Sequence, residues 1–400
     1  MIHAASASTA SFQEASSNLQ ALAEADVSPK RIGRLVTRIG NERIAEVQRQ
    51  SRQYKDLPIP LRTQSPVEIT PELVCVQVDG GRLQIRDRSS AANQARGPSD
   101  TFWRESKVGS LLKMTGSTYQ QDPCPEIPTV FVDPQRIRRL VGEIKGFSGD
   151  CAEAAASPSD PARHADEPYL SSDDLHESTR PQPLVRSVFA TAESIGEFGN
   201  RLVGQAYRRG FMAASRKAFV CDGMACNWTL HQKHFSRFTP ILDFVHAICY
   251  IYHAAVGGQP SVEAWERYCR WAQLTWAGDT ETLLKEMEAR QQQIGQPDND
   301  HETDPRQLLA DGIRYVTNQA QRMQYAEYRR QGLPITTAYI ESTIKQVNRR
   351  VKGTEKFWSL NANPILQLRA DALSETRELE KFWQRRPNQL TAFTHYNIAG

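Results

Sequence analysis

The chain has 400 residues, which suggests two or three folding units, and 39% of them are apolar, enough to build a sizeable core and to exclude wholesale disorder. Its net charge of +3 is too small to identify a partner by itself, so the distribution of charge carries more information than the sum. No apolar run approaches the roughly 20 residues needed to cross a bilayer, and the N-terminus lacks the basic flank and apolar stretch of a secretory signal. We therefore expect a cytosolic protein without membrane contact.

Residues 1–69 are expected to form a helical N-terminal region. Apolar residues recur at helical spacing through residues 1–56. The segment SPKRIGRLVTRIG is basic and amphipathic, and Ser28 and Pro29 form a helix start signal. Two interpretations of this helix stay open: a contact with nucleic acid, or a solvated helix that packs on its neighbour.

Residues 70–146 are interpreted as the first part of an α/β core. In LVCVQVDGGRLQIRDR, apolar residues alternate on both sides of an Asp-Gly-Gly segment, which is typical of a hairpin with its turn at Asp79. Residues 107–114 predict another strand. The run PTVFVD, which ends at Asp133, predicts a further strand that leads into a helix.

Residues 147–182 are rich in Ala, Ser, Pro and Asp, which indicates a low-complexity surface insertion. The second part of the core is expected over residues 183–255. There, VRSVFATAESIGEFGNRLVGQAYRRG predicts a helix and KAFVCDG a short strand, and TPILDFVHAICYIYHAA begins like a strand and continues as a helix.

Residues 256–332 contain apolar and tryptophan residues at helical spacing and no strand signal, which predicts a helical insertion. Residues 333–400 are expected to hold a last informative helix and a C-terminal helical region. That helix should begin after Thr336 or Thr337 and stop at Gly353.

The seven cysteines are scattered, and none of them forms a C-x-x-C pair. The short paired spacings of structural zinc sites are therefore missing. Cys75, Cys221 and Cys249 lie within apolar stretches, which favours reduced thiols packed in the core.

Three acidic residues occupy positions from which they could meet. Asp79 ends an apolar strand, Asp222 follows another, and Glu341 lies in the first turn of a helix. If the strands are neighbours, the three carboxylates converge at one edge of a sheet, where oxygen ligands suit magnesium or manganese. Each position also has a simpler explanation, because Asp-Gly is common in turns and the helix dipole favours an acidic residue near the N-terminus.

A set of sequence blocks gives these carboxylates a context. The blocks are VCVQVDGGRLQIRD followed by FWRESKVGSLLKM, then FVCDGMACNW, ILDFVHAICYIYHAA, and YIESTIKQVNRRVKGTEKFWS with ILQLRADALS behind it. They cover most of residues 70–375. In this order they resemble the DDE transposases of the Kra-type bacterial insertion sequences, a branch distantly similar to Mutator-like elements.

The resemblance implies an α/β fold with an RNase H-like mixed sheet flanked by helices, and an all-helical insertion before the last catalytic helix. Asp79 would be the carboxylate of the first strand, Asp222 that of the fourth strand, and Glu341 the helical one. Together they would be catalytic and would hold two Mg²⁺ or Mn²⁺ ions. The reaction would be cleavage of DNA at the ends of an insertion sequence, followed by strand transfer.

The resemblance also directs attention to a D-x-x-H pattern formed by Asp243 and His246. In these enzymes the pattern recurs just after the second catalytic Asp. It would support the metal site or the cleaved DNA end. A hydrogen-bonded structural histidine explains the same residues equally well.

Polar residues on the Glu341 helix have a DNA-binding interpretation, because cations beside a catalytic carboxylate suit the phosphate backbone. Spacing of three to four residues places some of them on the same side of the helix as Glu341. A solvated basic face is the alternative. Trp228, close after Asp222, could stack on a splayed base or belong to the core. The helix residues concerned are Lys345, Asn348, Arg349 and Lys352.

The expected partner is double-stranded DNA, both the terminal repeats of the element and its target, bound by a homo-oligomer associated with the nucleoid. Two other functions stay open. An inactive or domesticated remnant would only bind DNA; the missing cysteine-rich region that often precedes these blocks argues for this alternative, and the three filled acidic positions argue against it. A related nuclease would act on RNA–DNA hybrids.

Overall fold

The computed structural model describes residues 9–84, 103–143, 179–298, 304–351 and 362–394. Its centre is a sheet of five strands in the order β3-β2-β1-β4-β5. The strands β1, β2 and β3 are antiparallel to one another in turn, whereas β4 is parallel to β1 and β5 is parallel to β4. The fold is therefore mixed α/β with a mixed sheet, as the sequence predicts. The strands are β1 Leu73–Gln84, β2 Trp103–Thr115, β3 Gln182–Thr191, β4 Arg216–Cys221 and β5 Thr239–Leu242.

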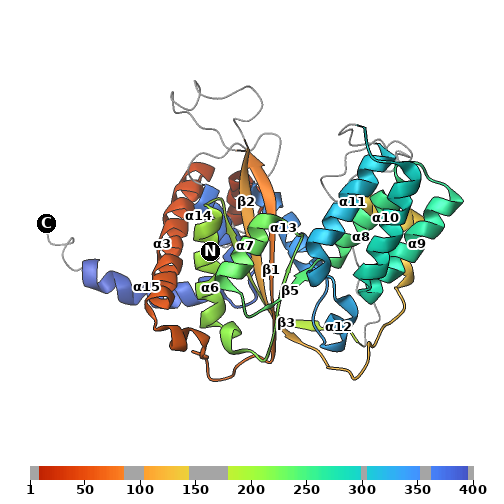
Figure 1. Cartoon of the computed structure of the whole chain (residues 1–400). Helices are drawn as coiled ribbons and strands as arrows, with labels where there is room; N and C mark the ends of the chain where they lie inside the picture. The colour runs from red at the N-terminus through yellow and green to blue at the C-terminus, as the bar shows by residue number, and fades with distance from the viewer. Residues whose placement is uncertain (1–8, 85–102, 144–178, 299–303, 352–361, 395–400) are drawn as a thin grey trace.

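Helices surround this sheet (Figure 1); in this view, α8 to α11 lie to the right of the strands and α3, α6 and α14 to their left. Most described helices begin after a serine or aspartate whose side chain accepts a hydrogen bond from the first turn. The helices and 3₁₀ turns are α2 Phe12–Ala23, α3 Pro29–Asp56, η1 Ile59–Thr63, η2 Thr129–Phe131, α5 Pro134–Glu143, α6 Ile195–Arg208, η5 Phe211–Ala213, α7 Ala225–His234, α8 Phe244–Val256, α9 Val262–Ala277, α10 Thr280–Ile294, α11 Pro305–Gln319, η6 Ala320–Arg322, α12 Tyr325–Arg330, α13 Ala338–Val351, α14 Ala362–Leu373 and α15 Glu378–Thr394.

Two apolar clusters fill the space on the two faces of the sheet. Val188 and Ala190 of β3 belong to the cluster that contains residues of α2, α3, α13 and α14. Phe189 between them belongs to the other cluster, which contains residues of α6, α7 and α8. This alternation is what the period of a strand requires. Helix α13 packs against β1 and β2, and α14 packs against β3 and α3.

Several sequence expectations are confirmed. Helices α2 and α3 lie within the N-terminal region, and β2 includes the strand expected over residues 107–114. Strand β5 is followed directly by α8, and the described elements that begin within residues 256–332, α9 to α12, are all helical, as the sequence predicts. Helix α13 begins just after Thr337. The expected stop at Gly353 and most of the low-complexity insertion lie outside the described residues.

The predicted hairpin at Asp79 is wrong. Strand β1 continues through the Asp-Gly-Gly segment, and Asp79 pairs with Val108 of β2 while Gly81 pairs with Ser106. Neither Gly80 nor Gly81 adopts the positive φ that the common two-residue hairpin turns require. An alternating pattern identifies a strand but not its partner, so the sequence alone does not distinguish one long strand through Asp79 from two strands joined by a turn.

Two further predictions of local structure are wrong. The run PTVFVD forms the 3₁₀ turn η2, and Asp133 then accepts a hydrogen bond from the backbone N–H of Arg136 at the start of α5. A short apolar run fits a strand and a buried turn equally well. The helix expected from Val185 begins only at Ile195 after the cap Ser194, because the preceding residues form β3.

Candidate active site at the carboxyl ends of β1 and β4

Asp79 and Asp222 lie on neighbouring parallel strands. Gln77 of β1 pairs with Val220 of β4, and Asp222 follows the last residue of β4. Two further residues along this register bring Asp79 level with Asp222, on strands that are about 4.8 Å apart. The sequence expectation that these two carboxylates meet at one edge of the sheet is therefore met at the level of the backbone.

The carboxylate of Asp79 is half-buried and lies in an acidic environment. Its Oδ1 accepts a hydrogen bond of 2.5 Å from the backbone N–H of Gly80. Burial and, after it, the negative charge of Asp222 raise the pKa of Asp79 to about 7, whereas His246 opposes the shift. The negative charges of Asp79 and Asp222 therefore repel each other.

Asp222 is held in a short, ordered loop between β4 and α7. Its Oδ1 accepts hydrogen bonds from the backbone N–H of Met224 at 3.0 Å and from the side-chain amide of Asn227 at 2.9 Å. The next residue, Gly223, has φ +92°, and a Cβ there would lie 2.9 Å from a methyl group of Leu242. Glycine is thus required at this position.

Helix α11 of the helical insertion supports the same loop. The hydroxyl of Tyr315 donates to the backbone carbonyl of Asp222 at 3.2 Å, and the side-chain amide of Gln319 donates to the carbonyl of Gly223 at 3.1 Å. The ring of Tyr315 also stacks on Tyr250 of α8 at a centroid distance of 3.7 Å. The insertion therefore fixes the position of one candidate catalytic carboxylate.

Asp243 and His246, the D-x-x-H pattern, form a connected pair behind the two carboxylates. Asp243 is fully buried, and its Oδ2 accepts from the backbone N–H of His246 at 3.0 Å and contacts His246 Nδ1 at 2.5 Å. Its Oδ1 accepts from the backbone N–H of Thr337 at 2.7 Å, and its own N–H donates to the carbonyl of Cys221. Asp243 thus joins β4, α8 and the entrance of α13.

Helix α13 runs alongside the part of β1 that carries Asp79. At its entrance, the side-chain amide of Gln77 donates to the backbone carbonyl of Thr336 at 2.9 Å. Further along, the side-chain oxygen of Asn348 lies 3.2 Å from where a Cβ of Gly81 would be. Asp79 lies between Gln77 and Gly81 along β1, and Glu341 lies between Thr336 and Asn348 along the chain.

The side chain of Glu341 lies outside the described part of the chain, so its backbone alone is placed, in the first turn of α13. Among the other expected DNA-binding residues of this helix, Lys345 is half-buried and Arg349 is exposed, while Lys352 lies outside the described residues. The Oδ1 atom of Asn348 is buried and accepts no hydrogen bond from a described residue.

Trp228 belongs to the core. Its side chain is 6% exposed and packs near Phe219 and His231, and the guanidinium of Arg322 lies 4.5 Å from the centre of its ring. The base-stacking interpretation of Trp228 does not fit this position, because the buried ring offers no accessible face to an incoming base.

Two contributors to the site were missed in the sequence. Asn227 gave no signal of its own, because asparagine near a helix start is common. Gln77 did give one: it is a polar residue in the apolar run LVCVQV, and it is fully buried. A buried polar residue needs a specific partner, and here the partner is the segment that leads into α13.

Over the described ranges, to which the side chain of Glu341 does not belong, no group of three or more His, Cys, Asp or Glu side chains is close enough to hold a metal ion. No helix in the same ranges combines the length and the apolarity needed to cross a bilayer. No protein-family model matches the chain, and no curated protein matches it.

Proposed function

We propose that the protein is a DDE-type DNA transposase with an RNase H-like catalytic core, in which Asp79, Asp222 and Glu341 are the catalytic carboxylates. The ordered sequence blocks support the family, and the strand order β3-β2-β1-β4-β5 supports the core. Asp79 stands on the first strand, Asp222 follows the fourth, and Glu341 belongs to a helix after the fifth, which is the arrangement that the resemblance implies.

The single observation that carries the proposal is the juxtaposition of Asp79 and Asp222. The two half-buried carboxylates lie at the same level of adjacent strands, where burial and, after it, the negative charge of Asp222 raise the pKa of Asp79. Such an arrangement costs stability and adds nothing to the packing of the sheet. A site for a cation explains it.

The donor set fits a hard divalent cation. Among the described residues, no lysine or arginine forms an ion pair with Asp79 or Asp222, so their charge is not neutralised within the described protein. Carboxylate oxygens are the ligands that Mg²⁺ and Mn²⁺ prefer. Asp79 and Asp222 would hold one ion together, and Glu341 would complete a second site. Bound there, two ions would supply Lewis acidity and activate water or a 3′-hydroxyl.

The protein's own groups have the task of keeping these carboxylates in place. Asn227 and the N–H of Met224 both bind Oδ1 of Asp222, which leaves Oδ2 without a hydrogen bond from a described residue. Asp243 fixes the entrance of α13 relative to β4. Lys345 and Arg349, on the same helix as Glu341, would contact the phosphate backbone of the DNA duplex and so orient it without reading its sequence.

The test is cleavage of a plasmid that carries the coding sequence of this chain with its flanking DNA, in the presence of Mg²⁺. We expect the wild type to nick it near the ends of the element and Asp79→Asn, Asp222→Asn and Glu341→Gln to lose cleavage while they still bind DNA. Glu288→Gln removes an exposed carboxylate of α10 and serves as the matched control.

Three other results would contradict the proposal in different ways. Cleavage by Asp79→Asn at the wild-type rate would exclude the carboxylate site. A wild type that binds the flanking DNA but never cleaves it would indicate a remnant with DNA-binding activity only. Faster cleavage of an RNA–DNA hybrid than of the flanking DNA in direct competition would indicate a nuclease.

A further inference from the structure

A second charged site lies at the opposite end of the sheet from Asp79. A cavity of about 240 Å³ opens between β2, β3, the end of α6 and the beginning of α15. Lys113, one of its lining residues, pairs with Val74 in the β1–β2 ladder. Val74 is five residues before Asp79, a distance of about 16 Å along the strand. The cavity is therefore separate from the candidate active site.

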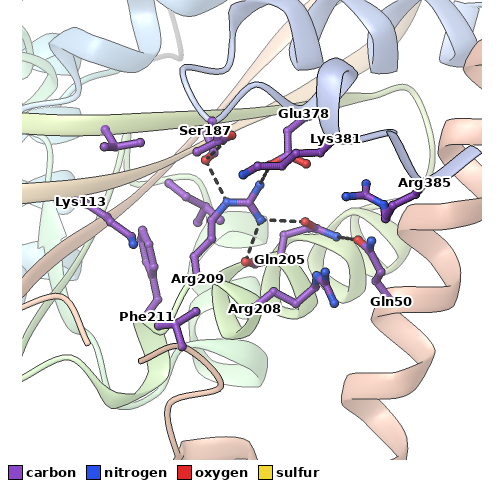
Figure 2. Close-up of a pocket in the computed structure, with 14 residues that line it drawn as sticks. Gln50, Lys113, Ser187, Gln205, Arg208, Arg209, Phe211, Glu378, Lys381 and Arg385 are labelled. Carbon is purple, nitrogen blue, oxygen red and sulfur yellow. Dashed lines mark hydrogen bonds and ion pairs between the residues drawn. The ribbon is translucent and has the colours of Figure 1, made fainter. Parts of the chain in front are cut away.

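The inner wall of the cavity is an arginine held rigidly by its neighbours (Figure 2). The guanidinium of Arg209 donates to Ser187 at 2.9 Å, to the side chain of Gln205 at 2.8 Å and to Glu378 at 2.6 Å. Behind it, Arg43 is buried and donates to Asp371 at 3.0 Å. These bonds fix Arg209 in one geometry before any ligand arrives.

The ion-pair network beside the cavity is balanced in charge. Its three arginines are matched by three carboxylates: Arg43 pairs with Asp371, Glu46 and Glu378, Arg209 pairs with Glu378, and Arg385 pairs with Glu46. Each carboxylate of this network already pairs with an arginine.

Three more cations nevertheless line the same cavity: Lys113, Arg208 and Lys381. None of them forms an ion pair with a carboxylate in the described part of the chain. Figure 2 shows Lys113 coming from β2 and Lys381 from α15. Burial lowers the pKa of Lys113, and the positive charges of Arg209 and Lys381 lower this pKa further. The cations repel one another, and an anion between them would relieve the repulsion.

The composition of the walls defines the anion. The one carboxylate at the wall, Glu378, lies near Lys381 but already pairs with Arg43 and Arg209. The three further cations therefore suit a phosphate group, with its higher charge and its several acceptor oxygens, better than a single carboxylate. Ser187, Thr376 and Gln50 add polar groups at the walls, and Phe211 adds an apolar one. The volume is below the range of pockets for drug-sized ligands, so it suits one phosphate group with a small part of the molecule that carries it.

We propose that this cavity is a binding site for a phosphate group, with Lys113 and Lys381 as its principal ligands and Arg209 as its fixed wall. The phosphate belongs either to a small phosphorylated molecule or to a nucleic-acid backbone that crosses this face. Both sources present the same chemistry to the site. The proposal does not depend on the carboxylates of Asp79 and Asp222.

The test is isothermal titration of the full chain with inorganic pyrophosphate at low ionic strength. We expect Lys113→Gln and Lys381→Gln each to weaken binding about tenfold or more, the loss expected for one charge-assisted hydrogen bond. Lys285→Gln removes an equal charge from α10, far along the chain from this cavity, and should bind as the wild type does. Asp79→Asn should also bind normally, which separates this site from the proposed catalytic one.

Competition with a short DNA duplex distinguishes the two sources. If the duplex displaces pyrophosphate and Lys113→Gln binds the duplex more weakly, the site takes a backbone phosphate. If pyrophosphate stays bound, the site takes a small phosphorylated molecule. The proposal is overturned if pyrophosphate does not bind the wild type, or binds Lys113→Gln as tightly as the wild type, with thermal melting showing that both proteins are folded.

Discussion

The backbone N–H of Thr337 donates a 2.7 Å hydrogen bond to the buried carboxylate of Asp243, which links two segments that are 94 residues apart in the chain. Thr337 is the residue before α13, and Asp243 is the residue before α8. The same carboxylate also contacts both the backbone and the ring of His246. One buried side chain therefore sets where the helix of Glu341 begins relative to the strand that ends at Asp222.

We expect Asp243→Asn to destabilise the protein by about 2 kcal/mol, because hydrogen bonds to a charged acceptor are replaced and one amide N–H would face the donors of Thr337 or His246. Chemical denaturation measures the change. Asp311→Asn, at a partly exposed ion pair of α11, should change the free energy of unfolding by less than about 0.5 kcal/mol. Equal effects of the two substitutions would contradict the positioning role of Asp243.

Asp79 should make the metal-free protein less stable as the pH rises. Its pKa in the folded state is about 7, above the ordinary value of 3.8, so the folded state binds more protons between these two values. Stability from this group is therefore complete below about pH 4 and is lost as the pH rises through 7. At pH 8 we expect Asp79→Asn to be more stable than the wild type by roughly 2–4 kcal/mol, measured by urea denaturation with a chelator.

Added Mg²⁺ provides the complementary experiment. It should raise the melting temperature of the wild type at pH 8, because binding to the folded state stabilises it by mass action. It should leave Asp79→Asn nearly unchanged. The control is Glu288→Gln, whose melting temperature should rise as much as that of the wild type. This result would show that loss of a distant carboxylate does not abolish the stabilisation by Mg²⁺. A rise of the same size in Asp79→Asn would place the ion elsewhere.

The sequence was sufficient to find the strand of Asp79 and the loop of Asp222, because an apolar run that ends in Asp-Gly is a local pattern. It was not sufficient to find the partner of β1. Asp79 pairs with Val108 of β2, and a segment of the chain separates the two strands in sequence, so no local pattern links them. The helix expected from Val185 failed for a related reason: β3 is recognisable only once β2 is beside it.

The contacts that assemble the candidate site are longer still in sequence. Gln77 reaches Thr336, and Asp222 is supported by Tyr315 of the helical insertion. Hydrophobic periodicity contains no information about such pairs, since it reports only which face of an element is buried. The sequence could therefore propose the three carboxylates, whereas the alignment of α13 with β1 had to come from the structure.

Arg43 should be the most sensitive position outside the candidate site. Its side chain is 1% exposed and pairs with Asp371, Glu46 and Glu378, which joins α3 to α14 and α15. Arg43→Met leaves buried carboxylates without their cation, and we expect a loss of about 3–5 kcal/mol. Lysine should not restore it, because an ammonium cannot donate in the planar geometry of a guanidinium.

The measurement is the free energy of unfolding in urea. Arg34→Met, an exposed arginine on the same helix, supplies the control and should differ from the wild type by less than about 0.5 kcal/mol. If Arg43→Met were as stable as this control, the network would be dispensable, and the N-terminal helix would be held by its apolar face instead.

Gly81 tests how closely α13 must approach β1. A Cβ at this position would lie 2.9 Å from Ser106 Oγ and 3.2 Å from Asn348 Oδ1. The methyl group of Gly81→Ala must therefore displace these two side chains and, with Asn348, move α13 away from β1. We expect a loss of about 1–3 kcal/mol in the free energy of unfolding, together with weaker Mg²⁺ binding, because α13 also carries Glu341. Gly142→Ala is the matched substitution: a Cβ there meets no atom within 4 Å, and in α5 it should be neutral or stabilising by up to about 1 kcal/mol.

Unfolding in urea with and without Mg²⁺ separates the effect of Gly81→Ala on stability from its effect on metal binding. If Gly81→Ala lost stability but bound Mg²⁺ as the wild type does, the metal site would not depend on the position of α13, and Glu341 would lose its proposed role.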